Sequence, residues 1–197
     1  MKICEFENGM KISAKIVVLF FSVVMLSCES YMPKPKGYMR FDLPEKEYRL
    51  FDSVCPFRFE YPVYGKMISV EGENCWYNLS FPQYRATVYL SYQPVRDNLA
   101  ELLDEAHIFA YVHDVKANAI EPQLVQTKNE NIVGLLFDIE GNAASSVQFF
   151  VTDSITHFFR GSLYFYSAPN SDSLAPLIDF FRKDIEHLIE TVDFKTK

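Results

Sequence analysis

A short apolar run that ends in a small residue and a cysteine decides where this chain can fold. The run covers residues 16–26 and is followed directly by Ser27 and Cys28. It is too short to cross a bilayer as a helix, which needs ~20 residues. A small residue and a cysteine after such a run are typical of bacterial lipoprotein signals, in which the cysteine becomes the lipidated first residue. We therefore predict a signal peptide over residues 1–27 and a lipid anchor on Cys28.

The leader departs from the usual signal pattern in two places. Signal peptides open with basic, acid-poor residues, yet Glu5 and Glu7 stand near the start of this one. Translation from Met10 would produce an ordinary short signal. The position three before the cysteine is Met25, where Leu is usual. The alternative to lipidation is an ordinary cleaved signal, or a weak anchor helix in which Cys28 occurs by chance.

The mature chain has the size of one domain and an acidic charge. Removal of residues 1–27 leaves 170 of the 197 residues, with 16 basic and 24 acidic side chains. We expect a tether and lead-in over residues 28–54 and a single domain over residues 55–197. Nucleic-acid binding depends on neutralising phosphates, so the acidic balance argues against that class of partner. The 12 tyrosines of the chain suit a protein-binding surface.

Two cysteines remain after the leader and the anchor are set aside. Outside the cytoplasm, Cys55 and Cys75 are expected to pair, and a disulfide closing a loop of this length contributes about 3 kcal/mol. Two buried free thiols are the alternative. No further ligand at a zinc-binding spacing joins them, and we expect no metal and no cofactor. Trp76 follows Cys75 directly. It is expected either to pack on the bridge or to form part of a binding surface.

The tether is rich in proline and carries three cations. Lys34, Lys36 and Arg40 lie close in sequence to the predicted acyl chains. Contact of these residues with anionic headgroups would strengthen anchoring, because one acyl chain alone holds weakly. A solvated spacer is an equal alternative.

Alternation of apolar and polar residues predicts a largely antiparallel sheet. Strands are expected over residues 57–61, 77–81, 86–92, 123–127, 133–139, 147–151 and 159–165. Aromatic residues on both sides of the last of these strands indicate that both faces of the sheet are covered.

Two segments have helical periodicity instead. The first begins at Asp97, the expected N-cap, and extends to about His113. The second begins after the capping residues Ser171, Asp172 and Ser173, with Pro176 in its first turn. Strands, helix, strands and helix in this order predict an α+β domain, an antiparallel sheet covered by helices.

A catalytic constellation is not apparent in the sequence. It contains no nucleophile elbow, no phosphate-binding glycine loop and no metal-spaced histidines. His113 and Asp114, near Lys116, form the most polar cluster, which we interpret as a solvated helix end.

A second cluster surrounds the hairpin turn at residues 141–142. Asp138 and Glu140 could serve acid–base chemistry or hold Ca²⁺, but they share one sheet face, and Asn142 is explained by turn formation. We therefore expect structural roles, with Arg160 pairing with Asp138 or Glu140 across the sheet.

Several long segments have unusual sequences: residues 33–40 (PKPKGYMR), 55–62 (CPFRFEYP), 141–150 (GNAASSVQFF), 172–178 (DSLAPLI) and 182–191 (RKDIEHLIET). Together they resemble the gliding-motility lipoprotein family GldD of Bacteroidetes bacteria, over nearly all of the mature chain. The resemblance implies a cell-envelope lipoprotein of the gliding machinery, linked to type IX secretion, and brings no catalytic residues. The order of elements is also similar to the PsbP-like fold, an α/β/α sandwich.

These observations predict an accessory lipoprotein that holds an envelope complex together by protein–protein contact. It would face the periplasm or the cell surface from a lipid anchor. The contact residues expected are those of the tether and the hairpin, with Trp76: Lys34, Lys36, Arg40, Asn142, Ser145, Ser146 and Trp76. The alternative is a periplasmic domain that binds a small ligand or glycan through Trp76 and exposed tyrosines. A cryptic hydrolase is the third reading.

Overall fold

The computed structural model describes residues 42–112, 116–167 and 170–195. The predicted lipid site Cys28 and the tether cations lie outside these residues, as does the cluster at His113 and Asp114. Among the described residues, no helix has the length and apolar character needed to cross a membrane.

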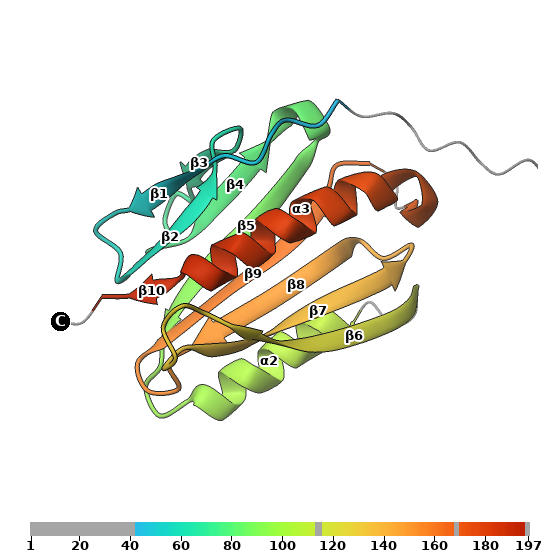
Figure 1. The fold of residues 1–197 in the computed structure, drawn as a ribbon. Coiled ribbons are helices and arrows are strands. Elements are labelled where there is room, and N and C mark those ends of the chain that lie inside the picture. The colour runs from blue at the N-terminus through green and yellow to red at the C-terminus, as the bar shows by residue number, and fades with distance from the viewer. Residues whose placement is uncertain (1–41, 113–115, 168–169, 196–197) are drawn as a thin grey trace, which may run out of the picture. The chain divides into compact units, whose positions relative to one another are not determined.

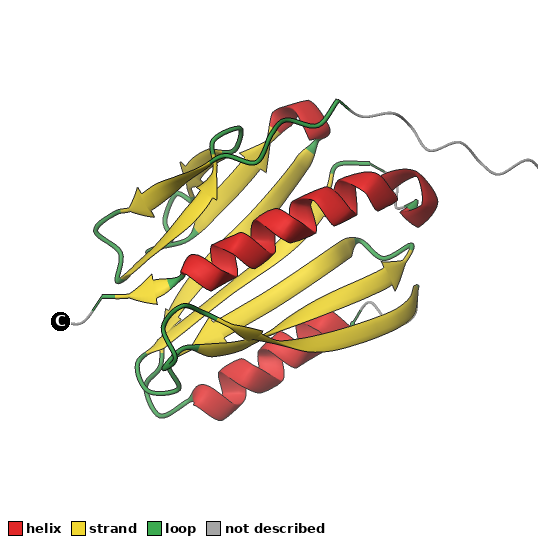
Figure 2. Ribbon diagram, viewed as in Figure 1, coloured by secondary structure: helices red, strands yellow, loops and turns green. Residues whose placement is uncertain are grey.

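A seven-stranded antiparallel sheet forms the centre of the domain (Figures 1 and 2). Neighbouring strands in this sheet are β3 (Lys66–Ser69), β4 (Tyr77–Phe81), β5 (Ala86–Pro94), β9 (His157–Phe165), β8 (Ser145–Thr152), β7 (Val133–Gly141) and β6 (Ala117–Gln126). A smaller sheet has the order β1 (Tyr48–Asp52), β2 (Phe57–Pro62) and β10 (Asp193–Phe194). A short 3₁₀ helix, η1 (Pro82–Tyr84), joins β4 to β5.

The two helices lie on opposite faces of the large sheet. Helix α3 (Ser171–Thr191) and the small sheet share one face, and α2 (Leu99–Tyr111) lies behind the half formed by β6 to β9 (Figure 1). Successive residues of a strand point to opposite faces of the sheet, so the domain has one hydrophobic core under α3 and a second under α2. Leu136 packs in the α3 core, and its neighbour Phe137 packs in the α2 core. The predicted class, α+β with an antiparallel sheet covered by helices, is confirmed.

Both helices begin at residues other than those predicted. Asp97 has a φ of 60°, in the left-handed region, and Asn98 is the N-cap of α2. The Asn98 side chain accepts a hydrogen bond from the backbone N–H of Arg96. Asn170 is the N-cap of α3, and its side chain accepts from the N–H of Ser173. The expected caps were wrong because several polar residues precede each helix, and local backbone geometry selects among them.

The sequence pattern missed the short strand β1 and predicted only part of β6. The first strand of the small sheet, β1, comes from the lead-in and pairs with β2 along its length. Strand β6 has ten residues and begins before the predicted segment at residues 123–127. A strand of a few residues has too little alternation to stand out, and its existence depends on a partner distant in sequence.

A buried carboxylate attaches the lead-in to α3. Asp184 is 2% exposed and accepts hydrogen bonds from the hydroxyls of Tyr48, at 3.1 Å, and Tyr64, at 2.6 Å. Lys46 forms an ion pair with it, with Nζ 2.7 Å from Oδ1. Burial lowers the pKa of Lys46 in spite of this partner, and burial together with Asp184 raises the pKa of Tyr64. The buried charge of Asp184 is thus balanced by Lys46 and by hydrogen bonds from two tyrosine hydroxyls.

The structure joins Cys55 and Cys75 by a disulfide whose Cα atoms lie 5.6 Å apart. Cys55 precedes β2 in the small sheet, and Cys75 precedes β4 near the edge of the large one. The bridge therefore links the two sheets at one end of the domain, where the Tyr77 hydroxyl lies 3.4 Å from the Cys55 sulfur.

Replacement of Asp184 by alanine is expected to destabilise the domain by about 3–5 kcal/mol, because it leaves Lys46 partly buried without its counter-ion. Urea unfolding measures this change. Asp179→Ala on the same helix is the control, since Asp179 and its partner Lys183 are both exposed, and it should cost less than about 0.5 kcal/mol. Equal stability of Asp184→Ala and the wild type would contradict the assignment.

Removal of the bridge by Cys55→Ala with Cys75→Ala is expected to lower the free energy of unfolding by about 3 kcal/mol, through the greater freedom of the unfolded chain. Denaturant unfolding of the oxidised protein and the double variant measures the difference. Alkylation before and after reduction counts the thiols by mass. Labelling of both cysteines without reduction would show that they are free.

Candidate functional site

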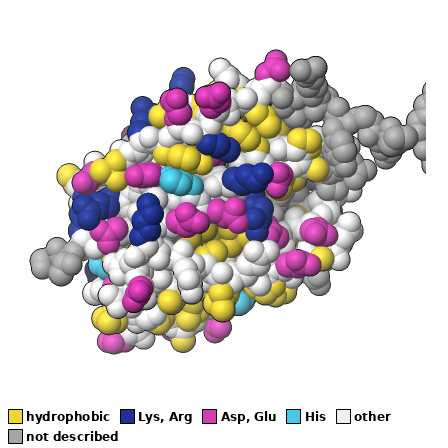
Figure 3. Space-filling model, viewed as in Figure 1, with side chains coloured by type: hydrophobic (Ala, Val, Ile, Leu, Met, Phe, Trp, Pro, Cys, Tyr) yellow, Lys and Arg dark blue, Asp and Glu magenta, His cyan; other side chains and the backbone are white. Residues whose placement is uncertain are grey.

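The hairpin singled out in the sequence lines a cleft beside α3. The cleft lies between the N-terminal half of α3 and strands β6 and β7, with a volume of about 400 Å³. Acidic and basic side chains lie side by side across the middle of this face (Figure 3). Its walls are formed by Asn118, Glu121, Asp138, Ile139, Glu140, Gly141, Ser146, Ala175, Ile178, Asp179 and Arg182.

Arg182 of α3 lies at one end of the cleft and binds Asp138 through two nitrogen atoms on one edge of its guanidinium. Its Nε lies 2.8 Å from Oδ1 of Asp138, and its Nη2 lies 2.8 Å from Oδ2. Gln123 accepts from Arg182 at 3.0 Å and donates to Asp138 at 3.0 Å, and Glu186 is a further partner of Arg182. The ion pair with Asp138 raises the pKa of Arg182. Asp138 is therefore saturated with donors, and its role here is to position α3.

The expected pairing of Arg160 with Asp138 or Glu140 is wrong. Asp138 points to the α3 side of the sheet, whereas Arg160 points to the α2 side, where its guanidinium lies 4.1 Å from the ring centre of Phe109. The pairing was wrong because a residue's position along its strand sets the face of the sheet to which it points. The sequence alone does not show which residues of two different strands point to the same face.

The cleft carries more negative than positive charge. Asp138 and Glu186 are paired with Arg182, and Asp179 is paired with Lys183. Two other carboxylates, Glu121 and Glu140, have no ion pair within the described part of the chain. Side chains suited to metal binding do not gather in groups of three or more anywhere in residues 42–112, 116–167 and 170–195. The cleft therefore offers carboxylate oxygens as hydrogen-bond acceptors to N–H or O–H donors of a partner.

The hairpin residues have separate roles. Gly141 has a φ of 100°, and a Cβ there would lie 2.8 Å from the backbone nitrogen of Asn118, so glycine is required. Asn142 is exposed at the tip. Ser145 is fully buried and donates to the carbonyl of Leu163 at 3.0 Å. Ser146 is also buried, against the cleft. Asn142 lies where a partner could reach it, whereas Ser145 is out of a partner's reach. That this hairpin forms a contact surface stays a prediction.

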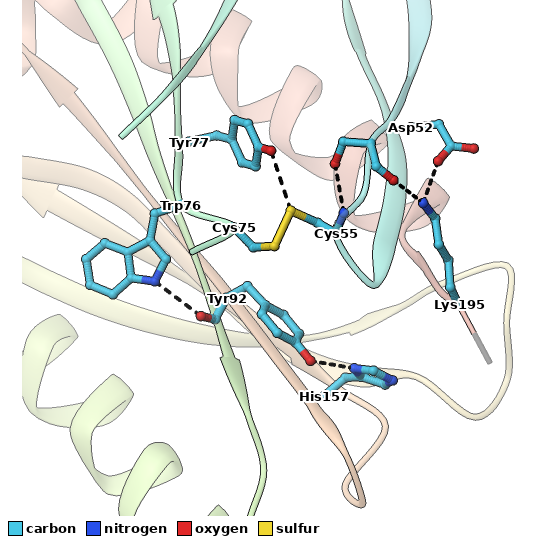
Figure 4. Close-up of a disulfide and its surroundings, with 9 residues drawn as sticks. Asp52, Cys55, Cys75, Trp76, Tyr77, Tyr92, His157 and Lys195 are labelled. Carbon is cyan, nitrogen blue, oxygen red and sulfur yellow. Dashed lines mark hydrogen bonds and ion pairs between the residues drawn. A yellow bond between two sulfur atoms is a disulfide. The ribbon is translucent and has the colours of Figure 1, made fainter. Parts of the chain in front are cut away.

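Trp76 projects away from the disulfide beside it (Figure 4). Its indole N–H donates to the carbonyl of Tyr92 at 3.2 Å, and the side chain that contacts the bridge is Tyr77, through its hydroxyl. Trp76 is half-exposed. The first of the two alternatives for Trp76, packing on the bridge, is not what the structure shows.

A larger cavity, of about 630 Å³, lies at the end of the domain that holds the disulfide. His157 stacks on Phe194 at 4.7 Å and lies 2.8 Å from the Tyr92 hydroxyl. Burial tends to raise the pKa of Asp153, but backbone N–H groups of the following turn donate to it and hold that pKa below its usual value. Sequence reasoning missed this cavity because its walls come from segments far apart along the chain.

Comparisons with known proteins bear on the fold and the family. No curated protein matches the chain. A solved structure of PsbP from the cyanobacterium Synechocystis sp. PCC 6803 (CyanoP) is 11% identical, with a TM-score of 0.44, and the match covers 81% of this chain and 99% of that one. The family model described as gliding motility lipoprotein GldD matches residues 28–194, a segment that begins at Cys28. The chain therefore belongs to the GldD family of gliding motility lipoproteins.

Proposed function

We propose that this protein is an accessory component of gliding machinery linked to type IX secretion, and that it acts by protein–protein contact at the membrane. Family membership supplies the lipoprotein character and the setting in the cell envelope. Asp138, one of the two carboxylates considered for acid–base work, is fully engaged by Arg182. Glu140, the other, lines the cleft, and we assign no reaction to the domain.

One end of the domain combines the point where the tether joins with the family-patterned hairpin. This end, here called the anchor pole, consists of η1, the hairpin at residues 141–144 and the start of α3 (Figure 1). Asp42 lies there, with its carbonyl accepting from the Tyr84 hydroxyl at 3.0 Å. Cys28 precedes Asp42 by 14 residues, which reach at most ~50 Å when extended. A lipid on Cys28 would therefore keep the anchor pole close to the membrane.

The observation that carries the contact role is an open sheet edge that ends at this pole. Strand β6 is an outer strand of the large sheet and runs for ten residues. Its Leu124 is 86% exposed. An open edge accepts an extended segment of a partner through backbone hydrogen bonds. Pro122 interrupts the row of donors, as in edges protected from self-association, so pairing would favour a matched partner over a second copy.

Photo-crosslinking from Asn142 in the native envelope is expected to capture a small set of specific proteins, because this residue is exposed at the anchor pole. Mass spectrometry of the adducts identifies them. Val54 is the matched control site, since its side chain is fully exposed beside Cys55, at the disulfide end. Recovery of the same abundant lipoproteins from both sites would count against the proposed role.

Cys28→Ala is expected to abolish lipid attachment and release the protein into the soluble periplasmic fraction, since the described residues include no membrane-spanning helix. Fractionation with immunoblotting measures the release. Cys75→Ala separates loss of the anchor from loss of a cysteine elsewhere, and it should remain with the membrane. Unchanged attachment of Cys28→Ala would show that something other than a lipid on this residue holds the protein.

A further inference from the structure

Among the described residues, one half of the large sheet has no helix on the face opposite α3. Helix α2 packs against residues of β7, β8 and β9, and its core contains no residue of β3, β4 or β5. Because Val88 and Leu90 of β5 face the α3 core, the alternate residues of β5 and of its neighbours face the opposite way. We call this surface the uncovered face; it consists of Ile68, Trp76, Asn78, Ser80, Thr87, Tyr89, Ser91, Arg160, Ser162 and Tyr164.

The uncovered face differs from the rest of the molecule in charge. The chain has 26 acidic residues, and the set that forms this face contains none of them. Its side chains are aromatic rings, hydroxyls, one amide, one guanidinium and the aliphatic chain of Ile68, which is 50% exposed. Lys66, paired in register with Ser80, adds a second cation at its margin. A surface of this composition on an acidic domain complements an anionic occupant.

Arg160 has a stacking partner but no acidic partner. Its guanidinium lies 4.1 Å from the ring centre of Phe109 on α2 and forms neither an ion pair nor a hydrogen bond within the described parts of the chain. Glu105, the nearest carboxylate in electrostatic terms, raises its pKa, but burial has the larger effect and lowers it. A half-buried arginine fixed by stacking is oriented to receive a carboxylate through two parallel hydrogen bonds.

Aromatic rings lie next to this arginine. Tyr164, two positions beyond Ser162 on the same face of β9, stands edge-to-face with Tyr89 at 5.6 Å between ring centres. Tyr89 is 37% exposed, and its hydroxyl lies 2.7 Å from that of Tyr166. This bond raises the pKa of Tyr89 to about 12, whereas the hydrogen bonds of Tyr166 with Thr87 and Tyr89 lower the pKa of Tyr166. The rings are therefore fixed in place and accessible from solvent.

We propose that the uncovered face binds a carboxylated oligosaccharide, with the sugar carboxylate on Arg160 and sugar rings on the faces of Tyr89 and Trp76. Pyranose rings present flat arrays of C–H groups that pack on aromatic rings, and their hydroxyls match the partly exposed side chains of Asn78, Ser80 and Ser91. Thr87 and Ser162 on the same face are buried. An acidic peptide fits this face less well, because a peptide also needs hollows for its apolar side chains. The cleft beside α3 and the cavity at His157 are both lined by residues outside this face.

This site is independent of the protein contacts proposed for the anchor pole. It lies on the α2 side of the sheet, while the cleft lies on the α3 side. Loss of sugar binding would leave the crosslinks from Asn142 intact, and the absence of specific crosslinks would leave sugar binding intact.

Calorimetric titration of the folded, lipid-free domain with trigalacturonate tests the site, with neutral maltotriose and a hexaglutamate peptide as comparison ligands. Trigalacturonate is expected to bind, maltotriose to bind at least about tenfold more weakly, and Arg160→Gln to weaken trigalacturonate binding by at least about tenfold. Lys183→Gln, which removes one positive charge from the α3 side, should leave binding unchanged. Tyr89→Ala should weaken binding, whereas Tyr89→Phe, which keeps the ring, should retain most of it.

Three outcomes would overturn the proposal. The first is the absence of measurable trigalacturonate binding at millimolar concentration. The second is equal weakening by Arg160→Gln and Lys183→Gln, which would indicate charge attraction without a site. The third is binding of hexaglutamate as tight as that of trigalacturonate, which would assign the face to an acidic peptide. Circular dichroism of each variant establishes that a loss of binding is not a loss of folding.

Discussion

Alternation of side chains along the seven-stranded sheet is the constraint on which the rest of the structure depends. Each strand sends successive residues to opposite faces, so one chain supplies a core under α3 and a second core under α2. The same rule separates the polar residues. Asp138 meets Arg182 of α3, and Arg160 meets Phe109 of α2. Two residues that seemed paired in the sequence therefore belong to different surfaces with different chemistry.

Helix α3 connects the parts of the domain that are most distant in sequence. Asp184 on its inner side binds Lys46, Tyr48 and Tyr64, and Arg182 on its flank binds Asp138. Asp184 is the more critical residue, because a buried charge is costly unless every partner is present. Through it, the segment that follows the tether is fixed to the centre of the fold.

The two ends and two faces of the domain have distinct properties, which suits a component that organises others. The anchor pole holds the first of the described residues, the exposed hairpin tip and one end of the open strand β6. The disulfide end holds the larger cavity. The cleft beside α3 is acidic, whereas the uncovered face has no acidic residue. An envelope protein with such a separation can engage a protein partner and a second ligand at the same time without competition.

Much of the central sheet and both helices could be predicted from residue patterns, because long runs such as residues 133–139 and 147–151 alternate clearly. The pairing of the two cysteines after the anchor was also foreseen as one alternative. The brief strands β1, β3 and β10 could not be predicted, since each forms only against a partner elsewhere in the chain. The helix caps Asn98 and Asn170 were missed because neighbouring polar residues offered equally good candidates.

The sequence by itself determined the class of fold, the predicted site of lipid attachment and the family, because these depend on local periodicity and on motifs that are contiguous in the chain. Only the tertiary structure decided which side chains meet. Arg182 became the partner of Asp138, Ser145 became buried, and Arg160 came to lie on Phe109 of α2 without an ion pair among the described residues. Such pairings depend on strand order and on the parity of each residue along its strand, which no segment contains in isolation.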